Sequence, residues 1–310
     1  MTEETMSLLR VLREQGQEVA EAAGEHGAES SGAMPMNELA DFASHHIADA
    51  KEIEFLWWHW NLDFLSIPTF DLGPLTIDLS PTRHVVIMVT VAVLMLAFIP
   101  LAGALRKRYR EKAPSGLANA MEALIVYFRD DVVRANIGHG ADAFTPFILT
   151  LFFFILGMNL IGLTPLGITP TANVSVTAAL AVVTLVVIEG AGFRALGPAG
   201  YARTIFFLPR GVPGFMKLPM LSILTVVEAM GKIAKPFALT IRLMANMTAG
   251  HTLILLLMGM IFVLQSYVMG VAAVAMGSVL MILELFVACL QAYIFAMLAS
   301  VFIGLIRHAH

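Results

Sequence analysis

Two long stretches without a formal charge constrain this chain more than any other feature of its sequence. No Asp, Glu, Lys or Arg occurs in the 46 residues between Asp142 and Glu189, or in the 41 residues between Arg242 and Glu284. A helix needs about 20 apolar residues to cross a bilayer, so runs of this length are expected only inside a membrane. The composition agrees, with 58% hydrophobic and 14% charged residues. A soluble globular protein is excluded.

The apolar runs divide into about five predicted transmembrane helices. These cover residues 85–105, 144–163, 172–193, 218–264 and 271–306. The second and third helices are separated by a turn rich in Thr, Pro and Gly at residues 164–170. The last two are predicted to form a long hairpin with its turn near residues 265–270. We therefore expect an all-α membrane protein.

Three segments outside these helices have different compositions. Residues 1–54 carry a net charge of −9 and are predicted to be an acidic extension that is poorly ordered or weakly helical. Residues 55–81 hold all three tryptophans, which suits a membrane interface. Residues 115–137 have helical apolar spacing but are too polar to cross, so we expect an amphipathic helix along the inner interface. The membrane-embedded domain is assigned to residues 82–310.

The positions of Lys and Arg predict how the chain is oriented. Basic residues collect after the first helix, from Arg106 to Lys112, and after the third, from Arg194 to Lys217. The turns at 164–172 and 265–270 carry none. Loops rich in Lys and Arg stay on the cytoplasmic side, so the N-terminus is expected outside and the C-terminus inside.

Overall charge and cysteine content exclude other classes of function. The net charge of −4 gives no support for a nucleic-acid partner. The only cysteine, Cys289, rules out an internal disulfide and a cysteine-based metal site. No cofactor or metal is expected.

Ionisable residues at membrane depth are the candidates for function, because a charge near the bilayer centre costs about 2.5 to 3.5 kcal/mol. The set comprises Glu189, Glu228, Lys232, Lys235, Arg242, His251 and Glu284, with Asn246 and Gln291 as polar companions. At about 100° per residue, Arg242, Asn246 and Glu228 fall on one face of a helix. Glu284 and Gln291, seven residues apart, are nearly eclipsed. Polar groups stacked along two antiparallel helices are what a proton route requires.

Structural roles compete with functional ones for most of these residues. Lys232 and Lys235 could snorkel to the interface, and Glu189 could be an interfacial charge. Glu228 and His251 could be satisfied polar residues of the core, and Gln291 could join two helices. Arg242 is different, because an arginine keeps its charge and needs a counter-charge or water.

The sequence around these residues resembles subunit a of F-type ATP synthase. The segment from Lys235 to His251, KPFALTIRLMANMTAGH, and the segment from Glu284 to Phe295, ELFVACLQAYIF, look like the signature of that family. NLIGLTP from Asn159 and TPTAN from Thr169 are also similar. The resemblance covers roughly residues 80–306, and the acidic extension has no counterpart.

The resemblance implies a non-catalytic stator subunit that carries protons past a rotating ring of c subunits. Arg242 would face the ring's carboxylate, and Glu284 with His251 would line the half-channel open to the outside. Gln291 and Asn246 would support the arginine and the route, and Glu228 would lie on the inner half-channel. The last two helices would pack on the c ring as a tilted hairpin. Ion choice depends on the ring's own site, and His251 favours protons over sodium.

The family also implies partners and a location. The expected partners are the c ring, subunit b of the peripheral stalk, the other ATP synthase subunits and the lipid bilayer. A bacterial inner membrane is favoured over the mitochondrial one.

The common bacterial pattern has Glu where this chain has His251 and His where it has Glu284, whereas mitochondrial members resemble this chain. Gly162 stands where some relatives have an acid, so no role is transferred to it.

Two other classes of membrane protein are weighed against this interpretation. A secondary transporter should show inverted internal repeats and broken helices in both halves, and no such repeat is found. A structural scaffold would not need five ionisable or amide groups in its last hairpin. An intramembrane enzyme is unsupported, since neither G-x-S-x-G nor HExxH occurs.

Overall fold

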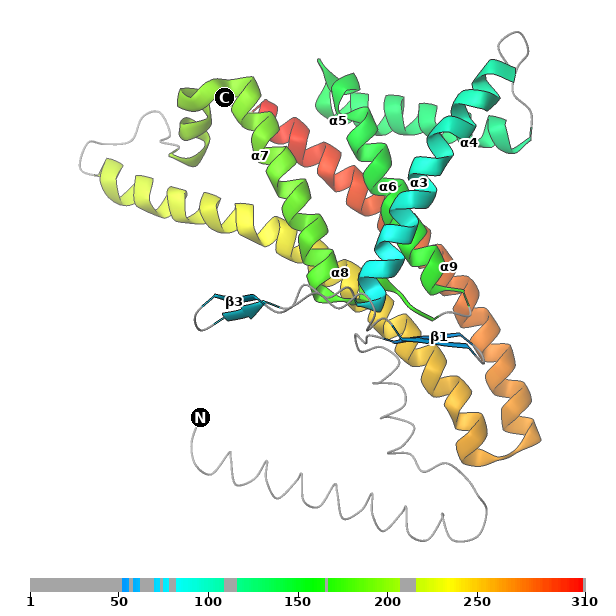
Figure 1. Ribbon diagram of the computed structural model, residues 1–310. Coiled ribbons are helices and arrows are strands. Elements are labelled where there is room, and N and C mark those ends of the chain that lie inside the picture. The colour runs from blue at the N-terminus through cyan, green and yellow to red at the C-terminus, as the bar shows by residue number, and fades with distance from the viewer. Residues whose placement is uncertain are drawn as a thin grey trace, which may run out of the picture. The chain divides into compact units, whose positions relative to one another are not determined.

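The computed structural model describes residues 82–108, 116–164, 167–206 and 216–308, with side chains in the first range described as far as Ala97. It also describes four short strands before them (Figure 1). Strands β1, Glu52–Phe55, and β2, Trp58–Asn61, form one antiparallel pair. Strands β3, Phe70–Leu72, and β4, Leu75–Ile77, form another. Strand β1 begins in the acidic extension and ends at the first residue of the aromatic segment, which holds the other three strands. The sequence predicted no strands in either segment, and most of the acidic extension lies outside the described residues.

Within the described residues of the membrane domain, all regular structure is helical, as predicted. Its long helices are α3, Arg83–Arg108; α6, Thr145–Gly162; α7, Val174–Ile205; α8, Lys217–Leu264; and α9, Tyr267–Arg307. The last four are long and apolar enough to cross a membrane, and α3 contributes a shorter described apolar stretch, Arg83–Ala97. The chain is therefore a multi-pass membrane protein. The turn between α8 and α9 holds only Gln265 and Ser266, within the range of 265–270 in which it was predicted.

Helix α7 extends twelve residues beyond its predicted end and bends on the way. Asn173 caps its start, because the side-chain oxygen accepts a hydrogen bond of 2.8 Å from the Ser175 N–H. At Gly197 the backbone turns to φ 68° and ψ 174°, and Pro198 follows. Glycine adopts this positive φ without a steric penalty. The bend changes the direction of the last turns of α7.

The predicted amphipathic helix is present but changes its winding midway. Helix α4, Leu117–Tyr127, leads into a π-helix η2, Phe128–Arg134, and then the short α5, Ala135–Ile137. The Val132 carbonyl accepts hydrogen bonds from the Asn136 amide at 2.6 Å and from the Ser300 hydroxyl of α9 at 3.0 Å. The wide turn therefore exposes a main-chain acceptor to which α9 binds.

A cluster of ion pairs closes the connection from η2 to α6. Arg134 donates hydrogen bonds to both carboxylate oxygens of Asp142, at 2.9 and 3.0 Å, and to Asp130 at 2.8 Å. The hydrogen bond from Arg134 holds the pKa of Asp142 below its usual value. Folding therefore favours the ionised carboxylate, and this contribution is lost only as the pH falls through the lowered pKa. All three side chains are exposed, so water and salt weaken the cluster.

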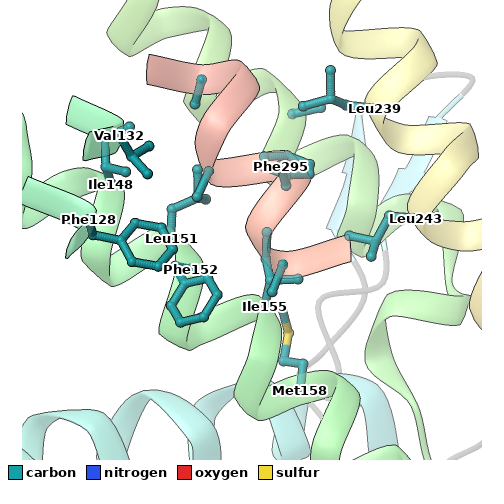
Figure 2. Close-up of a cluster of buried hydrophobic side chains, with 14 of the residues drawn as sticks. Phe128, Val132, Ile148, Leu151, Phe152, Ile155, Met158, Leu239, Leu243 and Phe295 are labelled. Atoms are coloured by element: carbon teal, nitrogen blue, oxygen red, sulfur yellow. The ribbon is translucent and has the colours of Figure 1, made fainter. Parts of the chain in front are cut away.

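The core of the domain forms where η2, α6, α8 and α9 meet. Figure 2 shows Phe128, Ile155, Leu243 and Phe295 in one cluster of buried side chains. The face of α9 in this cluster is rich in alanine. Its small residues are Ala292, Ala296 and Ala299, each fully buried. Small side chains let helices approach closely, which is the usual basis of packing in membranes.

Gly304 marks the tightest contact between α9 and the η2–α5 segment. A Cβ at this position would lie 2.0 Å from the Asn136 carbonyl oxygen, which is main chain and cannot move away alone. We predict that Gly304→Ala lowers the free energy of unfolding by about 1 to 3 kcal/mol, because the two segments must separate. Thermal unfolding of the detergent-solubilised protein measures the loss.

Gly190→Ala is the matched control for this substitution. Gly190 also lies in a transmembrane helix, but a Cβ there meets no atom within 4 Å. Its replacement should be neutral or slightly stabilising, since alanine favours a helix over glycine. Equal effects of the two substitutions would contradict the tight contact at Gly304.

The described residues fall into two compact units. One contains the end of α8 and the start of α9, residues 249–283, and is called the hairpin tip. The other contains the remaining described residues up to 248 and from 284 on, and is called the main unit. Within the hairpin tip a Cβ at Gly277 would lie 2.2 Å from the Met258 methyl group, so these helices also pack closely.

Candidate functional site

Helix α8 presents three of the predicted site residues away from the core. Leu243 and Met247 are buried, whereas Glu228, Arg242 and Asn246 are exposed. Arg242 and Asn246 are four residues apart, so they lie one turn from each other along the same face. At membrane depth an arginine on this face needs a counter-charge or water from outside the core of the chain. The guanidinium and the amide are therefore accessible to a partner molecule.

Helix α9 presents its two predicted site residues in the opposite way, toward the packed side. Glu284 and Gln291 are each 5% exposed. Ala288 and Ala292 are fully buried on the same side, at the spacing of one helical face. Both polar side chains thus lie within the packed face of α9, as their predicted eclipsed positions require.

A buried polar network joins α6 to this face of α9. The Asn159 amide donates a hydrogen bond of 3.3 Å to the Ala288 carbonyl, which lies between Glu284 and Gln291 along the helix. The Thr171 hydroxyl donates to the Asn159 side-chain oxygen at 2.6 Å. Asn159 and Thr171 are fully buried, so both ends of the amide are satisfied without water. These hydrogen bonds hold α9 in one rotation about its own axis and in one position along the length of α6.

The segment between α6 and α7, which contains Thr171, also contacts α8. It leaves no room for a side chain at position 162. The Thr248 hydroxyl donates a hydrogen bond of 3.4 Å to the Ala172 carbonyl. A Cβ on Gly162 would lie 2.0 Å from the Thr169 hydroxyl oxygen. A side chain larger than that of glycine therefore has no room at position 162.

A cavity of about 130 Å³ lies among α7, α8 and α9. Four charged residues line it, together with Thr184, Thr204 and apolar side chains. The charged residues are Glu189, Glu228, Lys232 and Lys235. The volume has room for about four water molecules at roughly 30 Å³ each. All four are candidate functional residues predicted from the sequence, and in the structure they line the same cavity.

His251 is half-buried in the hairpin tip, whereas the other five predicted site residues belong to the main unit. The coupling of His251 with Glu284 therefore stays a prediction. Among the described residues, no group of three or more His, Cys, Asp or Glu could hold a metal ion.

Sequence reasoning missed three residues of these networks. Asn159 and Thr171 were noted only within motifs, although an asparagine in an apolar helix is a signal for a buried hydrogen bond. Tyr201, which contacts Glu189, gave no signal, because its position depends on the bend at Gly197.

Comparison with known proteins places this arrangement in a family. The family model described as ATP synthase A chain matches residues 85–304. A Chloroherpeton thalassium protein named ATP synthase subunit a is 40% identical, over 85% of this chain and 75% of its own length. An Anaeromyxobacter dehalogenans protein of the same name is 42% identical, over 94% and 75%. One from Chlorobium luteolum, named ATP synthase subunit a 2, is 41% identical, over 92% and 82%. The chain belongs to the ATP synthase subunit a family.

Proposed function

We propose that this chain carries protons across the membrane through two offset half-channels and thereby couples proton flow to rotation of a c ring. The family is the proton-channel component of the synthase and is not itself catalytic. The observation that carries the proposal is the placement of Arg242 on an exposed face of α8, in a helix with no other charged residue for the next 22 positions. A c ring would occupy this face and bring its carboxylate to the guanidinium.

Two half-channels need an electrical barrier between them. A proton crossing 100 mV releases about 2.3 kcal/mol, and this energy drives rotation only if protons cannot pass directly from one half-channel to the other. Arg242 supplies a permanent positive charge, which repels a free proton and favours the anion of an approaching carboxylate. Asn246 and Gln291 would support the arginine and the route.

The remaining site residues would form the two half-channels. Glu284 and His251 would line the outer one. Glu228 would line the inner one, because it borders the cavity among α7, α8 and α9. The chain would work beside subunit b and the other synthase subunits. The basic loops favour a bacterial inner membrane topology with the N-terminus outside and the C-terminus in the cytoplasm.

The three predicted segments have distinct proposed places in this topology. Residues 1–54 would form an acidic extension outside the membrane, and residues 55–81 would lie at the outer interface. Residues 82–310 would form the membrane domain.

Vesicles with the complete complex should conduct protons, whereas vesicles from cells lacking this chain should not; equal conductance in both would refute the proposal.

Replacement of Glu228 tests the inner half-channel. We predict that Glu228→Gln slows proton flow by less than about tenfold, since a water-filled vestibule tolerates the loss of one relay group. Proton flow into inverted vesicles, driven by a potassium diffusion potential, gives the rate. Glu122→Gln, an exposed acid of α4, is the matched control and should be unchanged. Wild-type flow with a lowered yield of complex would instead assign Glu228 a structural role.

A further inference from the structure

An ion pair joins α7 and α8 beside the inner cavity. The Lys232 ammonium donates a hydrogen bond of 2.9 Å to the Glu189 carboxylate, and the two side chains are 17% and 23% exposed. Both side chains are largely removed from solvent, and each has a partner of opposite charge within hydrogen-bonding distance. Such a pair costs desolvation free energy, so its presence at membrane depth calls for an explanation beyond stability.

Tyr201 completes this group and depends on the bend of α7. Its hydroxyl donates a hydrogen bond of 2.5 Å to the same Glu189 oxygen, and Lys232 also donates to the hydroxyl at 3.3 Å. The ammonium lies 4.6 Å from the centre of the tyrosine ring. The bend at Gly197 lies between Glu189 and Tyr201, and the last turns of α7 bring the ring to the pair. Three contacts thus hold Lys232 to α7.

Within the pair each charge cancels the other, so the pair adds no net charge to the cavity wall. Among the described residues, α7 contributes Glu189 with Tyr201 behind it, and α8 contributes Glu228, Lys232 and Lys235. Helix α9 contributes only the apolar Phe302, Leu305 and Ile306. Two acids and two bases make the wall neutral. Lys235 is also turned to α9, with its ammonium 5.1 Å from the centre of the Phe302 ring.

We infer that Glu189 and Lys232 are positioning residues of the inner half-channel: their pairing keeps the cavity electrically neutral, so that Glu228 exchanges protons with the inner water. This inference rests on the function proposed above. Tyr201 holds the pair together. The residues would not themselves carry protons, which distinguishes them from Glu228.

Breaking the pair from either side should shift the pH dependence of proton flow in opposite directions. Glu189→Gln leaves an uncompensated positive charge, which lowers the proton concentration in the cavity, so the midpoint of the pH profile should move to lower pH. Lys232→Gln leaves a negative charge and should move the midpoint to higher pH. An uncompensated unit charge in a partly aqueous cavity of this size is expected to shift the midpoint by about half a pH unit.

The experiment measures potential-driven proton flow into inverted vesicles that hold the assembled membrane sector. The pH is varied in the external medium, which bathes the cytoplasmic side of the membrane and therefore the inner half-channel. The double variant Glu189→Gln with Lys232→Gln should return the midpoint to the wild-type value, because the wall is neutral again. Lys232→Arg should also keep it. Opposite shifts that cancel in the double variant support the inference. Shifts in the same direction, or losses of rate without a shift, overturn it.

Two control variants change the same charges away from the cavity. Lys217→Gln, at the exposed start of α8, and Glu122→Gln, on α4, should leave the midpoint unchanged. Absence of proton flow in wild-type vesicles would refute the proposed function itself. Flow with a wild-type midpoint in every variant refutes only the role of the ion pair, so the two failures are distinguishable.

Discussion

Vesicles that carry Arg242→Ala are expected to lose proton-driven ATP synthesis entirely, while passive proton leak through their membrane sector persists or rises. In the proposed mechanism the arginine supplies the permanent charge that separates the half-channels, so its removal would let protons pass without turning the ring. Arg242→Lys should restore little, because an ammonium lacks the rigid fork of the guanidinium and can lose its proton when desolvated. Synthesis and leak are measured in the same preparation under an imposed pH gradient.

The matched control is Arg203→Ala, which removes an exposed arginine from the end of α7. Its synthesis rate should equal that of the wild type. The assembled complex must be quantified in each preparation, because a lost subunit would also abolish synthesis. Near wild-type synthesis by Arg242→Ala or Arg242→Lys would be incompatible with the proposed role of this residue.

His251 and Glu284 are expected to act as one unit of the outer half-channel. The family resemblance implies that this chain has the imidazole and the carboxylate in exchanged positions relative to the common bacterial pattern, and we infer that the outer route requires one of each. His251→Ala and Glu284→Ala should each impair proton-driven ATP synthesis, because a proton relay loses one of its two groups. The double exchange His251→Glu with Glu284→His should recover a substantial part of the rate.

The single variants His251→Glu and Glu284→His are the necessary comparison for the exchange. Each places two like groups in the outer route, and the exchange restores one imidazole and one carboxylate. Coupled residues deviate from additivity in such a cycle. If the exchanged protein synthesises ATP no faster than the poorer single variant, the two residues are independent and the shared route is wrong.

The transmembrane helices could be predicted closely from the sequence, because charge exclusion from lipid is a strong and local signal. The helix predicted at 144–163 is observed as Thr145–Gly162, and the one at 218–264 as Lys217–Leu264. Helix α7 was predicted too short. Its last turns contain Arg194 and Arg203, which end the apolar run but do not end the helix.

Features that depend on contacts between distant segments could not be predicted. The π-helix at Phe128–Arg134 shifts the register by less than a full turn, so the apolar spacing there still fits an ordinary helix. Glu189 and Lys232 were both noted as ionisable residues at membrane depth, but their pairing requires the packing of α7 on α8. The spacing of residues along one helix predicts which side chains share a face. It does not predict which other helix packs against that face.

The tight contact at Gly304 has a mechanical consequence. The proposed c ring would push α8 and α9 sideways as it turns, and a free helix end would bend under that load. The C-terminal part of α9 instead meets the main chain of the η2–α5 segment, through the close approach at Asn136 and the Ser300 hydrogen bond to Val132. A predicted helix along the membrane surface spreads such a force over many lipid head groups. The same contact that leaves no space for a methyl group therefore stiffens the stator against torque.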